Sequence, residues 1–495
     1  MLRPGGADLT IAGGIREFGR ATPDVIAVRD GDRELTYAAL DERSSRVACG
    51  LLALGLRHGD RVALLCGNRL EYPEIAAGIA KAGLVLVPVN PRLTSPEVEF
   101  ILQHSGARAL LADEALLGAV PDVPIKKIFI GPSYETWIGV AKSEDPWIPV
   151  DEREPFCIAY TAGTTGDPKG VLISHRSRCL TFYAAALEWG LGPGRRTIAV
   201  APMYHGAGFA FAYAAVHCGG TVSMLRSFDP HRLLDMIDRD GAQSVFLVPT
   251  HAQLIRAASP AVKKLKTLDT LYFNAAALPK VLKEWVFEAF PGVGVHELYG
   301  STEAGVVTNL RPPDARRKAG SVGHPWFATE VRVVGGDGRP VGPGEPGELY
   351  SRSPYLMNGY HENPAATAAC TTPDGFLTSG DIVIRDEEGF ISIVDRIKDV
   401  IITGGVNVYP RDVEEVLLTH PSVTECAVVG EPDDRWGERV VAYLVGRAPL
   451  EPGVLDAFLR ERLAGFKVPK QYRAVPALPR NAAGKILKRE LRSTP

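Results

Sequence analysis

Alternation of helix-like and strand-like segments runs through about the first 390 residues, and it constrains the fold more than any other feature. Short apolar runs such as Arg61–Leu65 and residues 244–248 are typical of buried strands. An amphipathic segment between such runs begins at Ser95-Pro96, where we expect Ser95 to be the helix N-cap. Strands that alternate with helices in this way predict βαβ units and largely parallel sheets.

The pattern changes twice towards the carboxyl terminus. Residues 329–356 contain strand-like runs separated by Gly/Pro turns, which predict a small β-barrel or an antiparallel sheet. Two helix-like and two strand-like stretches follow Asp395-Arg396, at residues 412–418 and 455–463 and at residues 426–429 and 440–445. We therefore predict a compact α+β module of about 100 residues, and domains at residues 1–395 and 396–495.

Charge and composition exclude several classes of protein. The 495 residues carry 55 basic and 58 acidic side chains, a net charge of −3, which argues against a nucleic-acid-binding protein. Hydrophobic residues are 45% and charged residues 23% of the chain, so large-scale disorder is not expected. No apolar stretch reaches the ~20 residues of a membrane-spanning helix, and residues 1–11 lack the apolar core of a signal peptide. We expect no membrane insertion.

The cysteines indicate the compartment. Seven are spread along the chain without a CxxC or Cys/His cluster, and they are Cys49, Cys66, Cys157, Cys179, Cys218, Cys370 and Cys426. An odd and dispersed set predicts neither a disulfide framework nor a structural zinc site. The pattern is typical of a reducing compartment, so we expect a cytoplasmic protein.

Residues 160–171, Tyr-Thr-Ala-Gly-Thr-Thr-Gly-Asp-Pro-Lys-Gly-Val, carry the strongest local signal. They follow an apolar run at residues 156–159 and combine glycines that permit tight turns with hydroxyl donors and one cation. A loop of this composition can cradle a polyphosphate with its backbone N–H groups and its side chains. No Gly-Lys-Ser/Thr sequence follows, so the loop is not a Walker A motif.

Residues 160–171 resemble the signature of the adenylate-forming superfamily, which includes acyl-CoA synthetases, the adenylation domains of peptide synthetases and luciferases. Further motifs of that family follow in order, at residues 202–205, 274–277, 299–303, 378–381, 395–398, 404–405 and 484–485. Residues 249–251 and 434–437 are particularly similar to aryl-CoA ligases of the chlorobenzoate type. The resemblance implies a large α/β domain of two doubly wound subdomains plus a small β-barrel, and a mobile α+β carboxyl-terminal domain.

The resemblance implies roles for four catalytic residues. Lys485 would bridge the substrate carboxylate and the α-phosphate of ATP, where a cation offsets the repulsion between two anions. Thr302 would donate to the α-phosphate. Glu303 would bind Mg²⁺, which prefers hard oxygen ligands. His205 matches the family aromatic that moves to admit or exclude substrate, and the alternative for it is a hydrogen-bonded core histidine.

Most residues expected to bind the nucleotide belong to the same motifs. The phosphate loop supplies Thr161, Gly163, Thr164, Thr165, Gly166 and Lys169. The adenine and ribose side would involve Ala275, Ala276, Ala277, Tyr299, Gly300, Ser301, Asp381 and Arg396. A carboxylate such as Asp381 suits a ribose because it can accept hydrogen bonds from two hydroxyls.

The carboxyl-terminal motifs imply delivery of a thiol. Lys398 occupies the family's hinge position, about which the small domain is thought to rotate between two poses. After that rotation Gly404 and Gly405 would line a tunnel for a pantetheine arm, which passes close to backbone where side chains are absent.

Two aromatic residues match the positions that sandwich the CoA adenine in chlorobenzoate-type ligases. These are Trp436 and Phe466, and the alternative is that both belong to the core. Val468 departs from the family pattern, because a basic residue at that position would help to bind the CoA phosphates. The candidate substitutes for it are Lys467, Arg435 and Arg439.

The residues that the resemblance places around the acyl group are mostly small. They are Ala184, Gly206, Ala207, His251, Asn274, Leu298, Gly300, Gly305 and Val306. Small walls leave room for a ring or a medium chain, and Asn274 and His251 could bind one polar substituent. No Arg or Asp marks this pocket, so the sequence does not indicate a dicarboxylate or an amino-acid substrate.

The leading hypothesis is therefore an AMP-forming carboxylate–CoA ligase that acts on an aryl or medium-chain acid with ATP, Mg²⁺ and CoA. One alternative is an adenylating enzyme whose acceptor is a carrier-protein phosphopantetheine or an amine. A second alternative is a non-catalytic nucleotide- or acyl-binding relative. Because many relatives are dimers, a homodimer is also considered.

Overall fold

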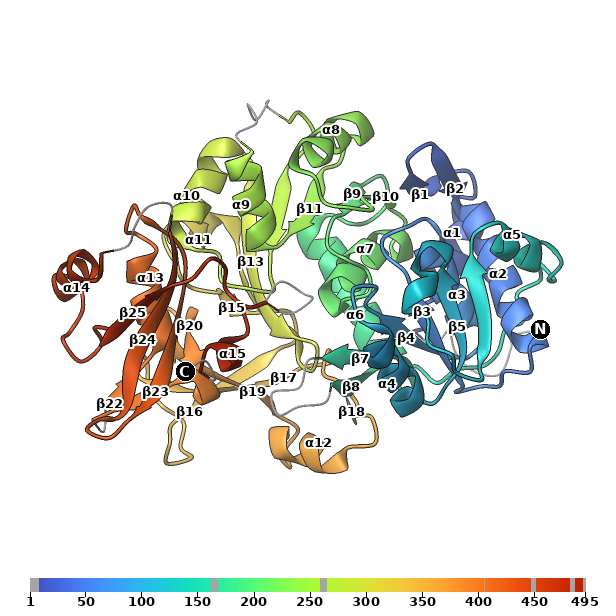
Figure 1. Ribbon diagram of the computed structural model, residues 1–495. Helices are drawn as coiled ribbons and strands as arrows, with labels where there is room; N and C mark the ends of the chain where they lie inside the picture. The colour runs from blue at the N-terminus through green and yellow to red at the C-terminus, as the bar shows by residue number, and fades with distance from the viewer. Residues whose placement is uncertain are drawn as a thin grey trace.

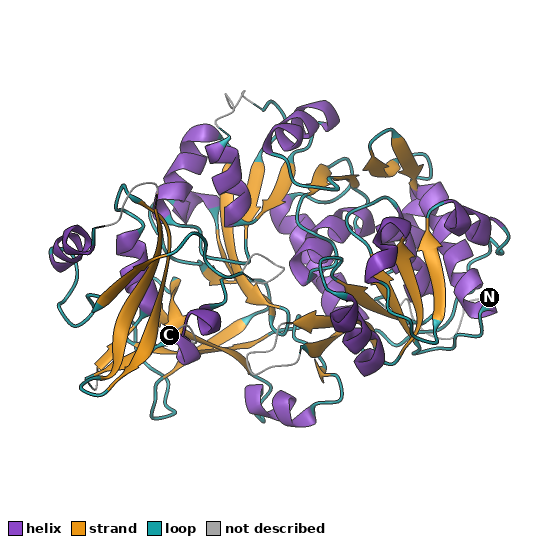
Figure 2. Cartoon of the chain, in the orientation of Figure 1, coloured by secondary structure: helices purple, strands orange, loops and turns teal. Residues whose placement is uncertain are grey.

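The computed structural model describes residues 9–161, 168–258, 265–404, 406–446, 451–480 and 486–492, and Figure 1 shows the path of the chain. The strands form four sheets, of nine, seven, four and five strands. Helices cover the two large sheets, as Figure 2 shows. Among the described residues, no helix is both long and apolar enough to cross a lipid bilayer.

The seven-stranded sheet comes mainly from the amino-terminal part of the chain, in the order β18-β8-β7-β4-β3-β5-β6. Its strands are β3 (Arg61–Leu65), β4 (Val85–Val89), β5 (Ala107–Asp113), β6 (Lys126–Ile130), β7 (Pro155–Thr161), β8 (Lys169–Ser174) and β18 (Gly359–Tyr360). Alternating with them are α3 (Glu71–Lys81), α4 (Ser95–Ser105), a 3-10 helix (Glu114–Ala119) and α5 (Pro132–Gly139). Strands β3 to β7 pair in parallel, so the predicted βαβ units are confirmed.

The start of α4 differs from the prediction by one residue. Thr94 is the N-cap rather than Ser95, and Ser95 and Pro96 open the first turn. Glu97 accepts hydrogen bonds from the Thr94 backbone N–H and hydroxyl, each at 2.7 Å. The physical reason is a reciprocal capping box, which needs a Thr or Ser three residues before a Glu.

The nine-stranded sheet has the order β15-β14-β13-β12-β11-β9-β10-β1-β2. Its strands are β1 (Ile26–Asp30), β2 (Arg33–Thr36), β9 (Arg196–Ala199), β10 (Thr221–Met224), β11 (Ser244–Leu247), β12 (Thr270–Phe273), β13 (Gly294–Ser301), β14 (Gly305–Leu310) and β15 (His324–Pro325). Six helices precede or follow these strands along the chain: α1 (Gly13–Ala21), α2 (Tyr37–Ala53), α8 (Pro230–Asp240), α9 (Pro249–Ala257), α10 (Lys280–Ala289) and α11 (Pro312–Ala315). Strands β1 and β9 to β13 are parallel, as predicted.

Two helices lie in the centre of the molecule, between the large sheets (Figure 1). They are α6 (His175–Trp189) and α7 (Gly206–His217). In α7 every residue from Gly208 to His217 is buried, because a helix that is apolar on all sides has to lie inside a core. The largest hydrophobic core joins both helices to both sheets.

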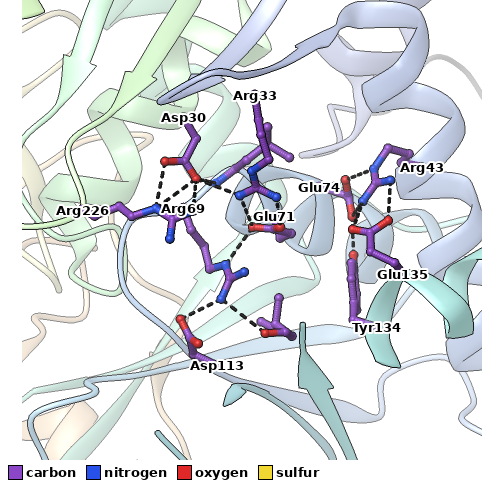
Figure 3. A network of polar contacts seen from close by, with 12 residues as sticks. Asp30, Arg33, Arg43, Arg69, Glu71, Glu74, Asp113, Tyr134, Glu135 and Arg226 are labelled. Carbon is purple, nitrogen blue, oxygen red and sulfur yellow. Dashed lines mark hydrogen bonds and ion pairs between the residues drawn. The ribbon is translucent and has the colours of Figure 1, made fainter. Parts of the chain in front are cut away.

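A network of ion pairs ties the two large sheets together (Figure 3). Its members lie at strand ends and helix starts, and they are Asp30, Arg33, Arg69, Glu71, Asp113 and Arg226. Asp30 of β1 forms an ion pair with Arg226 at 2.6 Å, and Asp113 of β5 forms one with Arg69 at 2.7 Å. The nearly buried Glu71 binds both Arg33 and Arg69 at 2.7 Å. The network fixes one sheet relative to the other.

The smaller sheets are both antiparallel over most of their strands. The four-stranded sheet has the order β16-β17-β19-β20, with β16 (Glu330–Val334), β17 (Pro346–Arg352), β19 (Leu377–Arg385) and β20 (Ile391–Arg396). Its described strands form an open sheet, so of the two predicted alternatives the antiparallel sheet is confirmed and the barrel is wrong. The helix α12 (Pro364–Cys370) precedes β19.

The carboxyl-terminal part of the chain forms its own sheet and two small cores, at one end of the molecule (Figure 1). Its elements are β21 (Ile401–Thr403), β22 (Val406–Val408), α13 (Pro410–Leu417), β23 (Val423–Asp433), β24 (Gly437–Gly446), α14 (Pro452–Arg460), β25 (Gln471–Ala474) and α15 (Lys488–Arg492). The predicted helices and strands are confirmed with shifted ends. The chain leaves the four-stranded sheet at Arg396 and passes through a 3-10 helix, Ile397–Asp399, before it enters this sheet.

Candidate active site

The β13–β14 hairpin presents Thr302 and Glu303 on its turn. Gly305 has a φ of +69°, and a Cβ on Gly300 would lie only 2.0 Å from the Gly305 carbonyl oxygen. Glycine is therefore required at both positions for the two strands to approach. The Ser301 hydroxyl accepts a hydrogen bond from the Ala304 N–H at 3.0 Å, which closes the turn.

Glu303 is held by a residue that the sequence did not reveal. The hydroxyl of Tyr360, on β18, donates to Glu303 Oε1 at 3.1 Å. Lys169 Nζ lies 5.1 Å from the centroid of the same tyrosine ring. Tyr360 thus brings the predicted phosphate-loop lysine and the predicted metal ligand together. Nothing in the sequence near residues 359–360 marked this tyrosine, because its partners are distant along the chain.

Asp381 binds two other predicted residues, Tyr299 and Arg396. The Tyr299 hydroxyl donates to Asp381 Oδ2 at 2.5 Å, and Arg396 Nε donates to Oδ1 at 2.9 Å. The side chain of Asp381 is nearly buried, and residues 381 and 396 are paired across β19 and β20. Burial and the adjacent Asp381 carboxylate raise the pKa of Tyr299, so its hydroxyl remains a donor.

The loop after β12 reaches the same edge of the nine-stranded sheet, because β12 and β13 are parallel neighbours. Ala275 has a φ of +74°, which is unusual for a residue with a Cβ. The Asn274 side chain accepts a hydrogen bond from the Ala275 N–H and supports this conformation. Ala275, Ala276 and Ala277 are all exposed.

The phosphate loop lies between β7 and β8, which pair Thr161 with Lys169 at its two ends. The Thr161 hydroxyl donates to the Lys169 carbonyl at 3.5 Å. The predicted residues Gly163, Thr164, Thr165 and Gly166 lie outside the described residues. So do Gly405 and the predicted catalytic Lys485.

The predicted acyl-pocket residues fall on α6, α7, α9, β13 and β14 and on the loop after β12. Leu298 and Val306 are buried on the β13–β14 hairpin, and Ala184 and Ala207 are half-buried on α6 and α7. The His251 ring stacks on Phe228 with centroids 4.4 Å apart, and its Nδ1 accepts a hydrogen bond from the Val248 N–H at 3.3 Å. Burial lowers the pKa of His251 to about 4, so the ring is neutral and Nε2 carries its proton.

His205 precedes α7 and faces the interior. Burial lowers the pKa of His205 to about 4, so this imidazole is also neutral near pH 7. A Cβ added at the next residue, Gly206, would lie 3.8 Å from the Thr302 hydroxyl oxygen. His205 and Gly206 line a cavity of about 10 Å³, which is about the room of one water molecule.

In the carboxyl-terminal domain, Gly404 packs against Trp436. The Gly404 N–H donates to the Trp436 carbonyl at 2.8 Å, and a Cβ on Gly404 would lie 3.0 Å from the indole ring. Trp436 and Phe466 are both exposed, so the alternative that they are core residues is wrong. Lys398 is exposed on the 3-10 helix Ile397–Asp399, between β20 and β21. Its carbonyl accepts a hydrogen bond from Arg492 at 3.2 Å.

Val468 is fully buried in the carboxyl-terminal core. Of the cations considered in its place, Lys467 pairs with Asp412 at 2.5 Å and Arg439 pairs with Glu431 at 3.0 Å. The Arg435 guanidinium instead lies 4.8 Å from the centroid of the Trp436 ring.

Comparison with known proteins matches both parts of the chain. The family described as AMP-binding enzyme matches residues 15–361, and the AMP-binding enzyme C-terminal domain matches residues 412–485. A feruloyl-CoA synthase from an Amycolatopsis species is 38% identical and covers 96% of each chain. A fatty acid–[acyl-carrier-protein] ligase from Streptomyces coeruleorubidus is 37% identical over 95% of this chain and 93% of its own.

Solved structures agree with these matches. The o-succinylbenzoate CoA synthetase of Bacillus subtilis, in complex with its acyl-adenylate intermediate, superposes with a TM-score of 0.90 at 30% identity. The match covers 97% of this chain and 98% of that one. The predicted mixed α/β fold with a separate carboxyl-terminal domain is confirmed, and so is the predicted class of AMP-forming carboxylate–CoA ligases.

Proposed function

Because this chain belongs to the AMP-binding enzyme family, we propose that it joins a small carboxylic acid to coenzyme A, with ATP and Mg²⁺, through an acyl-adenylate. One observation carries the proposal. Tyr299, Asp381 and Arg396, which come from three separate motifs, meet in one hydrogen-bonded cluster. Thr302 and Glu303 stand on the turn that ends the strand of Tyr299.

In the first half-reaction, a carboxylate oxygen of the acid attacks the α-phosphorus of ATP and pyrophosphate leaves. This step needs groups that hold both reactants in line and offset the developing charge. We assign Asp381 to the ribose, because its two hydrogen bonds leave lone pairs for two hydroxyls. We assign the Thr302 hydroxyl to the α-phosphate, and Lys485 to the contact between the α-phosphate and the carboxylate.

Glu303 fits the role of a magnesium ligand. Tyr360 occupies Oε1, and Oε2 has no hydrogen-bond or ion-pair partner in the described part of the chain. Mg²⁺ in nucleotide sites is commonly held by one or two carboxylates together with phosphate oxygens. When bound, the ion offsets the negative charge of the phosphates. Tyr360 orients the carboxylate for that contact.

In the second half-reaction, the thiol of coenzyme A attacks the carbonyl carbon of the acyl-adenylate and AMP leaves. We place the domain boundary between residues 395 and 396 and the hinge at Lys398, where the chain passes from one sheet to the next. We assign Gly404 and Gly405 to the path of the thiol. A side chain at Gly404 would collide with Trp436, so this position needs a glycine. Trp436 and Phe466 offer exposed aromatic faces to the CoA adenine.

The small residues around His205 support an aryl or medium-chain acid as the substrate class. We also place the enzyme in the cytoplasm, since all seven cysteines are free thiols and a reducing compartment keeps them so. A homodimer is proposed by analogy with the family alone.

A second candidate function is transfer to a carrier-protein phosphopantetheine or to an amine. Val468 is buried, and Lys467 and Arg439 are held in ion pairs. Of the cations considered for the CoA phosphates, this leaves Arg435 alone, and so small a set favours an acceptor other than CoA. The similarity to a fatty acid–[acyl-carrier-protein] ligase also supports it.

The test is pyrophosphate release with ATP and Mg²⁺ across a panel of aryl and medium-chain acids, with and without CoA. Turnover that requires CoA supports the ligase. Release that responds to acyl-carrier protein or an amine, and not to CoA, supports the second candidate. No release with any acid would overturn both and favour a non-catalytic relative.

A further inference from the structure

The contacts of Arg411 cross the proposed boundary between the two domains. Arg411 lies in the first turn of α13, in the carboxyl-terminal domain, whereas Ile393 and Asp395 lie on β20. The Arg411 guanidinium donates to the Ile393 carbonyl at 2.8 Å, and the Arg411 backbone N–H donates to Asp395 Oδ2 at 3.0 Å. One residue therefore joins the start of α13 to the strand that leads into the hinge.

These contacts are largely shielded from water. Asp395 is 8% exposed, and the side chain of Arg411 is 18% exposed. Asp395 Oδ1 also accepts a hydrogen bond from the Arg396 N–H at 2.8 Å, so both oxygens of this carboxylate have a partner. Hydrogen bonds that involve a charged group and are shielded from water are stronger than exposed neutral ones. The contact between α13 and β20 therefore contributes to the relative placement of the domains.

An ion pair connects α13 to the helix that follows Lys485. Lys488, the first residue of α15, pairs with Glu414 of α13 at 2.8 Å. Glu414 lies one turn after Arg411 and also accepts a hydrogen bond from the Val428 N–H of β23 at 2.7 Å. The helix α13 therefore links the contact with β20 to the part of the chain that carries the proposed catalytic lysine.

The observed arrangement of the domains keeps the proposed thiol path away from the nucleotide side. The strand β22 begins two residues after Gly404, and Figure 1 shows it at the outer edge of the molecule, away from β13. The β13–β14 hairpin presents Thr302 and Glu303. Gly404 can reach an acyl-adenylate at that hairpin only if the carboxyl-terminal domain turns. The observed arrangement therefore suits the first half-reaction and not the second.

A turn at Lys398 has to break the contacts of Arg411. Ile393 and Asp395 precede Lys398 in the chain and Arg411 follows it, so a change in the backbone angles of Lys398 separates the donors from their acceptors. The ion pair between α13 and α15 lies wholly after Lys398 and moves as one piece. The contacts of Arg411 to β20 thus exist in one arrangement of the domains and are lost in the other.

We propose that Arg411 is a positioning residue for adenylation. It holds the carboxyl-terminal domain in the arrangement of the first half-reaction, and its contacts to β20 are released before the thioester forms. The proposal rests on the proposed ligase function and adds a residue that contacts neither substrate nor cofactor. Because a contact made in only one of two states favours that state, its removal should slow one half-reaction and spare the other.

Arg411→Met removes the guanidinium and keeps an unbranched side chain. We expect adenylation, measured by pyrophosphate exchange, to fall about tenfold, whereas thioester formation from a supplied acyl-adenylate keeps or exceeds the wild-type rate. Arg411→Lys keeps a cation that can donate to the Ile393 carbonyl, and should restore adenylation to within about threefold of the wild type. A loss of general stability would instead lower both half-reactions together.

Arg460→Met is the matched control. Arg460 pairs with Asp456 one turn away on α14, as Arg411 pairs with Glu415 on α13, but the pair on α14 does not cross the domain boundary. Both half-reactions of this variant should keep the wild-type rate.

Limited proteolysis detects the contact without the reaction. Trypsin cuts after the exposed Lys398 when the hinge opens locally, so the fragment that begins at Asp399 should form faster in Arg411→Met than in the wild type or in Arg460→Met. If no acid supports pyrophosphate release but this difference is seen, the ligase proposal fails and the interdomain contact stands. Unchanged cleavage or unchanged adenylation in Arg411→Met, or an equal loss in both half-reactions, would overturn the inference.

Discussion

On the nucleotide side of the site, the carboxylates of Asp381 and Glu303 are each held by a tyrosine hydroxyl, at 2.5 and 3.1 Å. Beside His205, by contrast, Arg178 Nε and the Tyr72 hydroxyl are buried and have no hydrogen-bond partner among the described residues. Both regions border the Thr302–Glu303 turn, and they differ in whether the chain itself satisfies its polar groups.

The difference separates two ways of building a binding site. Groups that are held by neighbours are oriented before the ligand arrives, and they lose little freedom when it binds. Groups that are buried and unpaired raise the free energy of the empty protein, and a ligand that pairs with them recovers that cost. The first arrangement suits a nucleotide, which is bound in every turnover.

Lys485→Ala would break the nucleotide side most severely. We expect adenylation to fall by at least about 10³-fold, because the two anions that react would lose the cation between them. Thioester formation from a supplied acyl-adenylate should remain near the wild-type rate. Pyrophosphate exchange and CoA acylation, measured separately, check both statements. An equal loss in the two half-reactions would contradict this role.

Asp381→Asn tests the cluster that holds the ribose. The variant leaves the Arg396 guanidinium without its carboxylate and weakens the contact to Tyr299. We expect kcat/KM for ATP to fall about 100-fold, which corresponds to about 2.7 kcal/mol. The KM for the acid should change little. A fall shared equally by ATP and the acid would mean that Asp381 supports the fold rather than the nucleotide.

Tyr360→Phe is a smaller change on the same side. It removes one hydrogen bond from Glu303 Oε1 and keeps the ring that faces Lys169. We expect the Mg²⁺ concentration for half-maximal activity to rise about fivefold, since one hydrogen bond contributes about 1 kcal/mol. Tyr350→Phe is the control, because Tyr350 contacts a carboxylate on the four-stranded sheet away from this turn. An unchanged Mg²⁺ dependence would show that Tyr360 does not orient the carboxylate.

The burial of His205 should make the stability of the protein depend on pH. The pKa of His205 is about 4 in the folded protein, below the ordinary value of 6.5. The unfolded chain therefore binds the proton more readily than the folded protein. Above pH 6.5 this group does not lower the free energy of unfolding, and as the pH falls from 6.5 towards 4 it lowers that free energy progressively. Between pH 7 and pH 5 this group alone would cost about 2 kcal/mol of unfolding free energy.

His205→Gln should reduce that loss, as measured by urea unfolding at the two pH values. His231→Gln, at an exposed position, is the control. If His205→Gln and the wild type lose the same stability between pH 7 and pH 5, the imidazole is not buried in its neutral form.

Much of the fold followed from the sequence because hydrophobic periodicity reports local structure directly. Apolar runs such as Arg61–Leu65 are strands, and the alternation with helices gave parallel sheets. Local pattern could not distinguish an open antiparallel sheet from a barrel at residues 329–356, because closure depends on strand pairing that is distant in the chain. The N-cap of α4 shifted to Thr94 because a capping box competed with the Ser-Pro signal.

The site was predictable where motifs carry its chemistry and unpredictable where partners are distant. Tyr299, Asp381 and Arg396 were named from their motifs, and the structure brings them together. Tyr360 was missed because its partner Glu303 lies far away in the sequence. Arg178 could have been noticed as a cation on the apolar stripe of α6, since Phe182, Ala185 and Trp189 follow it at helical spacing.

A single-turnover experiment with α-labelled ATP and the best acid tests whether this enzyme is a CoA ligase that works through an acyl-adenylate. Without CoA, we expect labelled acyl-adenylate to accumulate on the enzyme and pyrophosphate to form in a stoichiometric amount. Addition of CoA should convert the intermediate to acyl-CoA and labelled AMP. An acyl-adenylate that persists after CoA is added would rule out CoA as the acceptor, and labelled ADP as the product would rule out an acyl-adenylate intermediate.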